Sequence, residues 1–409
     1  MVYRVGGSGS LECALLPARM PTINSMMLTC HSHESIAEVD QQAWDSIAGH
    51  VPFLRHDFLS VLELTGCVSE ATGWQPQHLT LTDGQQRLVA AMPMYLKYDS
   101  WGEFVFDFSW ADAYRRAGRE YYPKLVCAVP FTPATGPRLL LHPDYDPAVL
   151  ASELLSGAKN VAEQHAASSI HMLFPEPNQV QLLADLGLRL RKDCQFHWHN
   201  QNYQDFDEFL AEFSSSKRKK ARRERRRIKE NGVRFETLRA DCVAEDDWDA
   251  VFEFHARTFY RRGRAPYLNR QAFDMLRERM PASMVIVLGR LERTPLAAAI
   301  CFRSADTLYG RYWGSLDDFH SMHFETCYYQ GIDYCIREGL QRFEPGTQGE
   351  HKVSRGFLPV ATHSAHWLAD RSFDLAIQDF LVRERAHVDG YIKAMNARSP
   401  YRSLGPTPP

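Results

Sequence analysis

The sequence predicts a protein of two lobes, each built on a mixed α/β sheet, with a further helix at the C-terminal end. A chain of 409 residues is longer than one ordinary core and fits two domains of roughly 150–200 residues each. One order of elements is predicted twice: two helices, a hairpin, a strand, a long helix and a short strand. This repeat favours a tandem mixed-sheet fold, with a boundary at the polar segment Asn200–Gln204.

The hairpin is the clearest element of the first lobe. Its strands are predicted at Gln77–Thr82 and Gln86–Tyr98, and Asp83-Gly84 between them is a typical hairpin turn. Helices are predicted before it at 36–48 and 53–65. After it we expect a strand at Pro137–Leu141, a long helix at Pro147–His165 and a short strand at Ser169–Phe174.

The second lobe repeats this order. Its hairpin is predicted at Ser283–Leu291 and Pro295–Arg303, joined through Glu292–Thr294, and both hairpins end in a similar small, apolar strand. Helices are predicted before it at 246–261 and 270–280. After it we expect a strand at Thr307–Gly314, a helix at His323–Gly339 and a strand at Arg342–Pro345.

These elements give a domain layout. We predict a first lobe over 27–200 with an aromatic-rich insertion at 99–131, and a second lobe over 201–372 that opens with a basic helix at 214–232. Residues 373–398 are expected to form the C-terminal helix, followed by a tail at 399–409. Residues 1–26 are expected to be a disordered extension, with Met26 or Met27 as an alternative start.

The bulk composition excludes several classes of protein. A net charge of −3 gives no molecule-wide field for nucleic acid, so any anion binding must come from a local patch. Nine scattered cysteines without a C-x-x-C pair indicate reduced thiols rather than disulfides or zinc. His197-Trp198-His199 offers two imidazoles but no third ligand, so we expect no metal. No apolar run approaches the ~18–20 residues of a membrane span, so we expect a cytoplasmic protein.

The basic helix is the strongest charge feature. Lys217–Lys229 holds ten Lys or Arg in thirteen residues, with Glu224 as its only acid and Ala221 and Ile228 as its apolar contacts. A solubilising surface is the ordinary explanation of a charge run. This density favours a polyanion instead, such as a tRNA acceptor stem, a CoA phosphate or an acidic polymer. We expect Arg222, Arg223 and Arg226 to contact it beside a cleft between the lobes.

A glycine-rich motif, FEPGTQGEHKVSRGFLP, follows the strand predicted at Arg342–Pro345. Acylation of an amine needs a base and donors for an oxyanion. Glu344, Glu350 and His351 are the candidate bases, and Lys352 and Arg355 are candidate donors to the oxyanion or to a donor phosphate. A surface connection with charged side chains is the structural alternative.

The chain resembles a known family at several of these segments. They are PFLRHDFLSVLELTGCVSEATGWQPQHL (52–79), YYPKLVCAVPFTPATGPRLL (121–140), FHWHNQNY (196–203), SSKRKKARRERRRIKENGVRF (215–235), LYGRYWG (308–314) and RFEPGTQGEHKVSRGFLP (342–359). Over about residues 30–400 the sequence resembles the bacterial FemAB-like family, described by peptidoglycan biosynthesis or recognition. More distantly it is similar to the aminoacyl-tRNA-dependent aminoacyltransferases with tandem GNAT domains. The resemblance implies a tandem GNAT-like (acyl-CoA N-acyltransferase) fold and N-acyl transfer.

Two further segments gain a meaning from this resemblance. GNAT folds place the acyl group at the strand that ends here in Tyr312 and Trp313, and the next loop normally cradles a CoA pyrophosphate. Ser315–His323 has no glycine and carries Asp317 and Asp318, so we doubt ordinary acetyl-CoA binding. Independently of the resemblance, the rings from Phe104 to Trp110 alternate as on an extended strand. They are either core or an aromatic wall of a substrate cleft that includes Trp110, with Asp107 and Asp112 recognising an amine.

The leading hypothesis is an N-acyltransferase that moves an acyl or aminoacyl group from acyl-CoA or aminoacyl-tRNA to a small-molecule or peptide amine, with cell-wall precursors as one acceptor class. No permanently bound cofactor is expected, and tRNA is a candidate partner of 217–229. The first alternative is a catalytically inactive module that recognises a polyanion or cell-wall precursor through the basic helix. A structural partner in an assembly is the second. Donor, acceptor and oligomeric state stay open.

Overall fold

The computed structural model describes residues 27–316, 321–347 and 349–402. The extension predicted at 1–26 and the last part of the tail, 403–409, lie outside these residues. Residues 317–320 also lie outside them. They include Asp317 and Asp318, on which the prediction against a pyrophosphate cradle depends. In the described part of the chain, no helix is long and apolar enough to cross a membrane.

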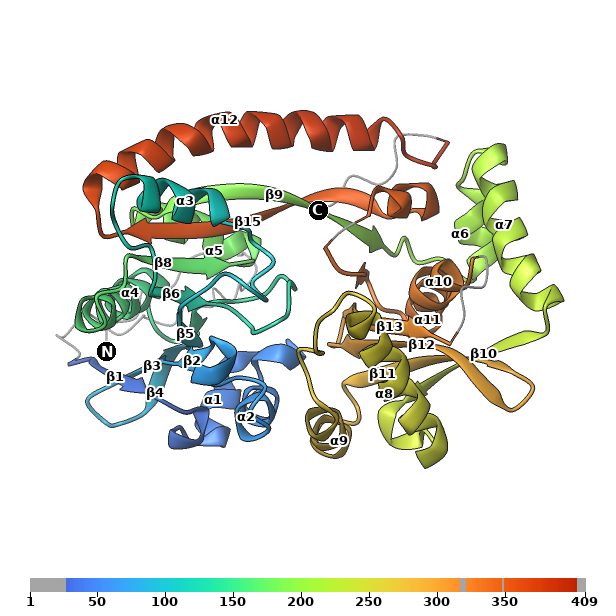
Figure 1. The fold of residues 1–409 in the computed structure, drawn as a ribbon, viewed down its shortest axis with the longest axis horizontal. Coiled ribbons are helices and arrows are strands. Elements are labelled where there is room, and N and C mark those ends of the chain that lie inside the picture. The colour runs from blue at the N-terminus through green and yellow to red at the C-terminus, as the bar shows by residue number, and fades with distance from the viewer. Residues whose placement is uncertain (1–26, 317–320, 348, 403–409) are drawn as a thin grey trace, which may run out of the picture.

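The first part of the chain forms a small sheet and one end of a large one (Figure 1). Its strands are β1 (Thr29–His33), β2 (Gln75–Pro76), β3 (His78–Thr82), β4 (Leu88–Met92), β5 (Met94–Lys97), β6 (Lys124–Cys127), β7 (Leu140–Leu141), β8 (Ser169–Leu173) and β9 (Arg189–His199). Its helices are α1 (Gln41–Ala48), α2 (His56–Leu64), α3 (Phe108–Arg116), α4 (Pro147–Gln164) and α5 (Pro177–Asp185), with short 3-10 turns η1 (Ile36–Glu38), η2 (Pro52–Leu54) and η3 (Glu70–Thr72).

The second part forms the other end of the large sheet. Its strands are β10 (Val233–Arg239), β11 (Met284–Leu291), β12 (Thr294–Arg303), β13 (Thr307–Ser315), β14 (Arg342–Glu344) and β15 (Leu358–Leu368). Its helices are α6 (Phe206–Ala211), α7 (Ser215–Glu230), α8 (Glu245–Tyr260), α9 (Arg270–Arg279), α10 (Met322–Phe324), α11 (Gln330–Glu338) and α12 (Arg371–Asn396). Shorter turns are η4 (Ala240–Cys242), the π-helical η5 (Glu325–Tyr329) and η6 (Glu350–Arg355).

Both predicted hairpins are confirmed. β3 pairs antiparallel with β4, and β11 pairs antiparallel with β12. The helices predicted at 214–232 and 373–398 are present as α7 and α12. The strand predicted beside Thr307–Gly314 is also present, because β14 pairs parallel with β13. Consecutive parallel strands joined by a helix are usually neighbours, and here they are.

The strand predicted at Pro137–Leu141 is much shorter than expected. Only Leu140–Leu141 forms a strand, β7, and it pairs with β4 in the small sheet. The parallel partner of β8 is instead β6, which lies inside the segment predicted as an insertion. β6 has four residues and all are buried, so it shows no polar–apolar alternation by which a strand could be recognised.

Two long strands cross between the halves of the molecule. β9 pairs with β14 at His199 and Trp198, and with β15 along most of its length. β15 comes from the second half of the sequence, yet its far end pairs with β8 of the first half. The result is one sheet of eleven strands, in the order β10-β11-β12-β13-β14-β9-β15-β8-β6-β5-β2.

Apolar contacts also join the halves. Phe53 of η2 lies 5.2 Å from Phe302 and 5.1 Å from Tyr309, ring centre to ring centre. The helix α12 runs along β9 and β15 at one face of the sheet (Figure 1). The apolar side of α12 is buried at Ile377 and Leu381. Asp374 of α12 forms an ion pair with Arg189 of β9 at 2.6 Å.

Candidate active site

The sheet opens at the end of β14. β13 and β14 pair at three positions, the last being Tyr309 with Glu344. Beyond that point β13 continues to Ser315 with β12 as its partner, while the chain after β14 turns away. The carboxyl ends of parallel strands are where open α/β sheets bind ligands. The helical segment that follows β13 contains the π-helical turn η5 between α10 and α11, a rare feature that is frequent at functional sites.

A pocket of about 550 Å³ lies beside α7, and no residue of β13 or β14 lines it. One wall is α7, a second is η6, and the remaining wall contains Phe324 of α10 and Arg398 after α12. Its lining includes the cations Lys217, Lys220, Arg223 and Arg227 of α7. Their spacing of three, three and four residues places them on one face of the helix.

Glu224 explains how such a charged helix is held in place. It is 6% exposed, and its carboxylate accepts a hydrogen bond from Arg355 at 2.8 Å and from the Tyr329 hydroxyl at 2.6 Å. Ala221 and Ile228 are buried on the same side, as the sequence indicated. The buried face of α7 therefore consists of these three residues, and the pocket cations flank it.

The three arginines predicted to bind donor do not act together. Arg223 lines the pocket. Arg222 is exposed and pairs with Asp207 at 2.9 Å, and Arg226 is exposed and pairs with Glu230 at 3.4 Å. Lys217, Lys220 and Arg227 also line the pocket but were not predicted individually from the sequence. Helical spacing from the buried pair Ala221 and Ile228 is the signal that would have selected them.

His351 faces the pocket from η6. Its side chain is exposed, and Nε2 lies 2.8 Å from the hydroxyl of Tyr328 on the π-helical turn. Partial burial and the nearby charges of Arg355 and Lys352 lower the pKa of His351, so the imidazole is neutral at pH 7. The ring also presses on Gly349, where φ is +117° and a Cβ would lie 2.4 Å from the ring, so only glycine fits there.

Arg355 lines the pocket together with His351, whereas Lys352 does not line it, and both side chains are almost fully buried. Arg355 is 2% exposed, stacks on Phe324 at 3.2 Å and donates to the carbonyl of His351 at 2.8 Å. Lys352 is also 2% exposed and donates to the carbonyl of Gly346 at 2.6 Å. Burial lowers the pKa of Lys352 to about 7. Both side chains position the loop that carries His351.

The two candidate carboxylates are separated. Glu350 lines the pocket, but Arg398 pairs with it at 2.8 Å and the Tyr391 hydroxyl donates to it at 3.3 Å. Glu344 does not line this pocket. It is buried, lies 3.1 Å from Arg342 Nε, and accepts from the backbone N–H of Thr135 in the first half at 3.3 Å. Burial raises the pKa of Glu344.

Tyr312 and Trp313 lie on opposite faces of β13, as successive strand residues must. The Trp313 ring packs at a tilt against His323, with the ring centres 4.5 Å apart, and the His323 ring lies 5.7 Å from that of His351. Tyr312 faces the other way, toward His255 at 4.5 Å, and burial raises its pKa to about 12. Tyr312 and Trp313 therefore do not face one cleft, and neither lines the pocket beside α7.

The extended strand predicted for the rings around 104–110 is wrong. Phe108–Arg116 forms the helix α3, in which Trp110 and Tyr114, four residues apart, share the buried face. Trp110 is 3% exposed and packs on His366 at 4.9 Å, while Asp112 is exposed and pairs with Arg115. Neither lines the pocket beside α7.

A second pocket, of about 830 Å³, lies between the halves of the chain. From the first half it is lined by Thr135–Pro137 and Glu176–Gln179, which follow the parallel pair β6 and β8. From the second half Asp306, Tyr309 and Arg342 contribute. Among the residues that the structure describes, no group of three His, Cys, Asp or Glu could hold a metal ion.

Comparison with known proteins places this architecture. The structure of FemX is similar over 83% of this chain and 98% of its own, with 12% identity and a TM-score of 0.52. The C-terminal domain of a putative lysylphosphatidylglycerol synthetase from Agrobacterium fabrum is similar over 85% of this chain and 97% of its own, with 12% identity and a TM-score of 0.50. No curated protein matches the sequence.

At these identities the likeness shows the fold alone, a mixed α/β architecture, and the C-terminal helix is present as the sequence predicted. The sequence itself matches the model of the FemAB-like family, described as peptidoglycan biosynthesis/recognition, over residues 35–403. That match spans most of the 409 residues, so the chain belongs to the FemAB-like family.

Proposed function

We propose that the protein is a cytoplasmic N-aminoacyltransferase that uses aminoacyl-tRNA as donor and a small-molecule or peptide amine as acceptor. The observation that carries the proposal is the pocket in which the α7 cations face His351 of η6. The family description supports an acceptor from peptidoglycan biosynthesis.

The length of the cationic track favours tRNA over acyl-CoA as donor. α7 has 16 residues and is therefore ~24 Å long. Its Lys and Arg continue over most of that length, beyond the four that line the pocket. A pyrophosphate would occupy one end of such a track, whereas successive phosphates of an RNA strand would follow all of it. Acyl-CoA remains the competing donor in the experiment below.

His351 is the proposed base. The acceptor nitrogen attacks the ester carbonyl, a C–N bond forms, and the nitrogen loses a proton to His351. The C–O bond to the terminal ribose then breaks, and the ribose oxygen takes the proton from His351. When His351 Nε2 donates to the Tyr328 oxygen, Nδ1 carries the lone pair that accepts the proton. Trp313 and His323 pack against this group.

One observation favours the second function, a catalytically inactive module that binds a polyanion. Within the described residues, the His351 ring forms its hydrogen bond with a tyrosine hydroxyl rather than with a carboxylate. The carboxylate of the neighbouring Glu350 forms an ion pair with Arg398 instead. A base without an orienting carboxylate is a weaker catalyst, whereas the cationic wall would bind just as well.

Both functions are tested by one series of measurements. Binding of deacylated tRNA and of acetyl-CoA is measured between roughly 50 and 200 mM salt. Single-turnover transfer from radiolabelled aminoacyl-tRNA to a peptidoglycan stem peptide is then followed for the wild type, His351→Gln, Glu350→Gln and Glu344→Gln. We expect salt-sensitive tRNA binding. His351→Gln should lose ~10²–10⁴ in rate with its tRNA affinity unchanged.

The matched control is His387→Gln, an exposed histidine of α12 outside the pocket. It should transfer at the wild-type rate. Tight tRNA binding without transfer to any acceptor amine would favour the binding module. Binding that ignores salt, or that prefers acetyl-CoA, would refute the role given to α7.

A further inference from the structure

The segment 98–108, here called the strap, joins β5 to α3 with its polarity inverted. Most of its buried side chains are polar: Ser100, Glu103 and Asp107 are 0%, 3% and 2% exposed, and Val105, at 7%, is the buried apolar one. Its exposed side chains are aromatic: Trp101, Phe106 and Phe108 are 48%, 49% and 40% exposed. Surface segments ordinarily bury rings and expose charges. An arrangement that does the opposite needs a physical cause.

The cause is a buried lysine below the strap. Lys124 of β6 is fully buried and donates to Ser100 at 2.9 Å, to Glu103 at 2.8 Å and to Asp107 at 2.5 Å. Asp107 accepts a further bond from the Tyr121 hydroxyl at 2.6 Å. Removing one partner would leave a charge buried and unpaired, so the polar side of the strap is fixed inward. The rings are consequently fixed outward.

The three rings form one patch. Phe106 and Phe108 stack with centres 5.9 Å apart, and Trp101 lies 5.6 Å from Phe108. From the second half of the chain, the guanidinium of Arg264 lies 4.1 Å above Trp101. Arg264 belongs to an exposed turn that also carries Arg262. The patch therefore combines apolar rings with arginines at its edge.

The area of the patch limits what can cover it. Aromatic side chains bury ~150–250 Å² each, so three rings about half exposed present on the order of 300 Å². A stable protein interface takes about 800 Å² from each partner. A single-stranded nucleic acid would need cations along its path, but the strap has no Lys or Arg and three acids. A lipid bilayer needs neither: interfacial rings insert at the headgroup level, and arginines meet lipid phosphates.

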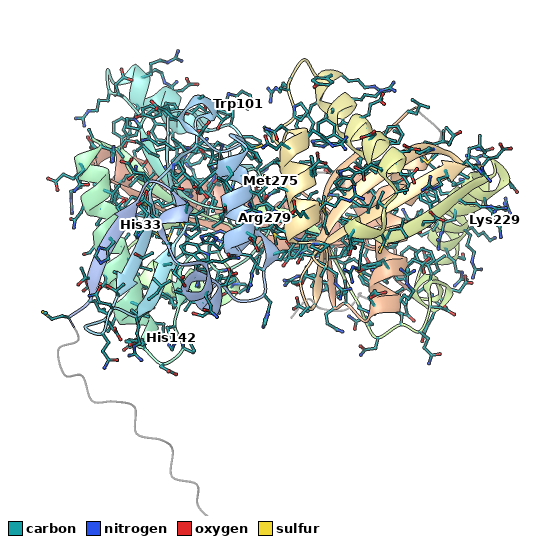
Figure 2. All side chains as sticks on the ribbon, turned by 90° about the horizontal axis from the view of Figure 1, so that it is seen from below. His33, Trp101, His142, Lys229, Met275 and Arg279 are labelled. Carbon is teal, nitrogen blue, oxygen red and sulfur yellow. The ribbon has the colours of Figure 1, made fainter. Side chains whose placement is uncertain are left out.

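We propose that the strap docks the protein on the surface of a lipid bilayer, with Trp101, Phe106 and Phe108 inserted and Arg262 and Arg264 at the phosphates. The patch is distinct from the pocket beside α7. Trp101 and Lys229, near the end of α7, lie far apart in the molecule (Figure 2). The proposal does not rest on the transfer reaction, because vesicle binding is read without donor or acceptor.

The test is flotation of the full chain with vesicles of phosphatidylcholine and phosphatidylglycerol. We expect Phe106→Ser with Phe108→Ser to lower the partition coefficient at least tenfold. Leu375→Ser with Val382→Ser is the matched control, since these α12 residues are 51% and 55% exposed and lie outside the strap. Equal loss in both double variants, or in neither, would overturn the proposal.

A second measurement separates the strap from the cations of α7, which also attract anionic lipid. All eight tryptophans lie in the described residues, and of these Trp101 is the exposed one. Lipids brominated on their acyl chains should therefore quench part of the wild-type fluorescence, and Trp101→Phe should abolish that quenching while circular dichroism shows the fold intact. Quenching that persists in Trp101→Phe would place the contact elsewhere and refute the strap.

Discussion

Glu224 is the residue whose loss should most change the basic helix. It is the only acid between Lys217 and Lys229, and it is buried against Arg355 and Tyr329. Replacing it with alanine is expected to release α7 from the pocket wall without unfolding the sheet. Because the pocket cations lie on that helix, their position would be lost together with Glu224.

The magnitude follows from what remains after the substitution. Removing one member of a buried ion pair typically costs ~3–5 kcal/mol, since the other charge stays desolvated. Arg355 would keep bonds to the His351 carbonyl and to Ser354 and its contact with Phe324, none of them anionic. Ile228, the larger apolar contact of α7, contributes ~1.5–3 kcal/mol. The free energy lost with the ion pair is therefore comparable to the free energy that burial of Ile228 contributes. A loss of ~3 kcal/mol shifts the equilibrium between the docked and the open helix roughly 150-fold toward the open state.

Hydrogen exchange of the amides of 215–230 measures this opening directly. We expect Glu224→Ala to speed exchange there by ~10² or more, with the strands β11 and β12 unchanged. Glu230→Ala is the matched control, because its pair with Arg226 is on the surface and worth ~0–1 kcal/mol. Replacing both members, Glu224→Leu with Arg355→Met, should restore much of the protection. Equal effects of Glu224→Ala and Glu230→Ala would refute the reasoning.

Other substitutions probe the packing and the buried lysine. Gly314→Ala places a Cβ 1.9 Å from the carbonyl oxygen of Phe254 and should lower the free energy of unfolding by ~3 kcal/mol or prevent folding. The Cβ of Gly390→Ala in α12 meets nothing within 4 Å, so this substitution should raise the free energy of unfolding by ~0.5–1 kcal/mol. Urea unfolding measures both changes. The pKa of Lys352 is lowered to about 7 in the folded protein, so the unfolded chain binds more protons between pH 7 and the ordinary lysine pKa near 10.5; stability should rise with pH across that window. Urea midpoints of Lys352→Met should lack that rise, and an identical pH profile in wild type and variant would contradict the assignment.

The local elements of the fold could be predicted from the sequence because their signals are local. Asp83-Gly84 between two apolar runs gives a hairpin, and the spacing of Ala221 and Ile228 gives a helix with one thin apolar side. The exchange of β9 and β15 could not be predicted, because each strand would satisfy its hydrogen bonds equally well in its own half. Only the packed tertiary structure distinguishes the two arrangements.

The candidate site was predicted in its composition but not in its geometry. His351, Arg355 and Arg223 do meet around one pocket. Arg355 pairs with the buried Glu224, which lies 131 positions away in the sequence. Neither segment alone contains a signal that predicts this contact. The same holds for Glu344, which is near His351 in sequence but bonds Thr135 across the molecule. Proximity along the chain identified candidates, and burial then decided which of them face solvent.

The eleven-stranded sheet has a mechanical consequence. Hinge bending between the halves would have to break the ladder in which β9 pairs with β14 and β15. Backbone hydrogen bonds in a buried sheet are not given up cheaply. The two halves therefore move as one rigid body, and a substrate cannot be enclosed by closing one half onto the other. Any gating during turnover therefore falls to short segments at the rim of the sheet.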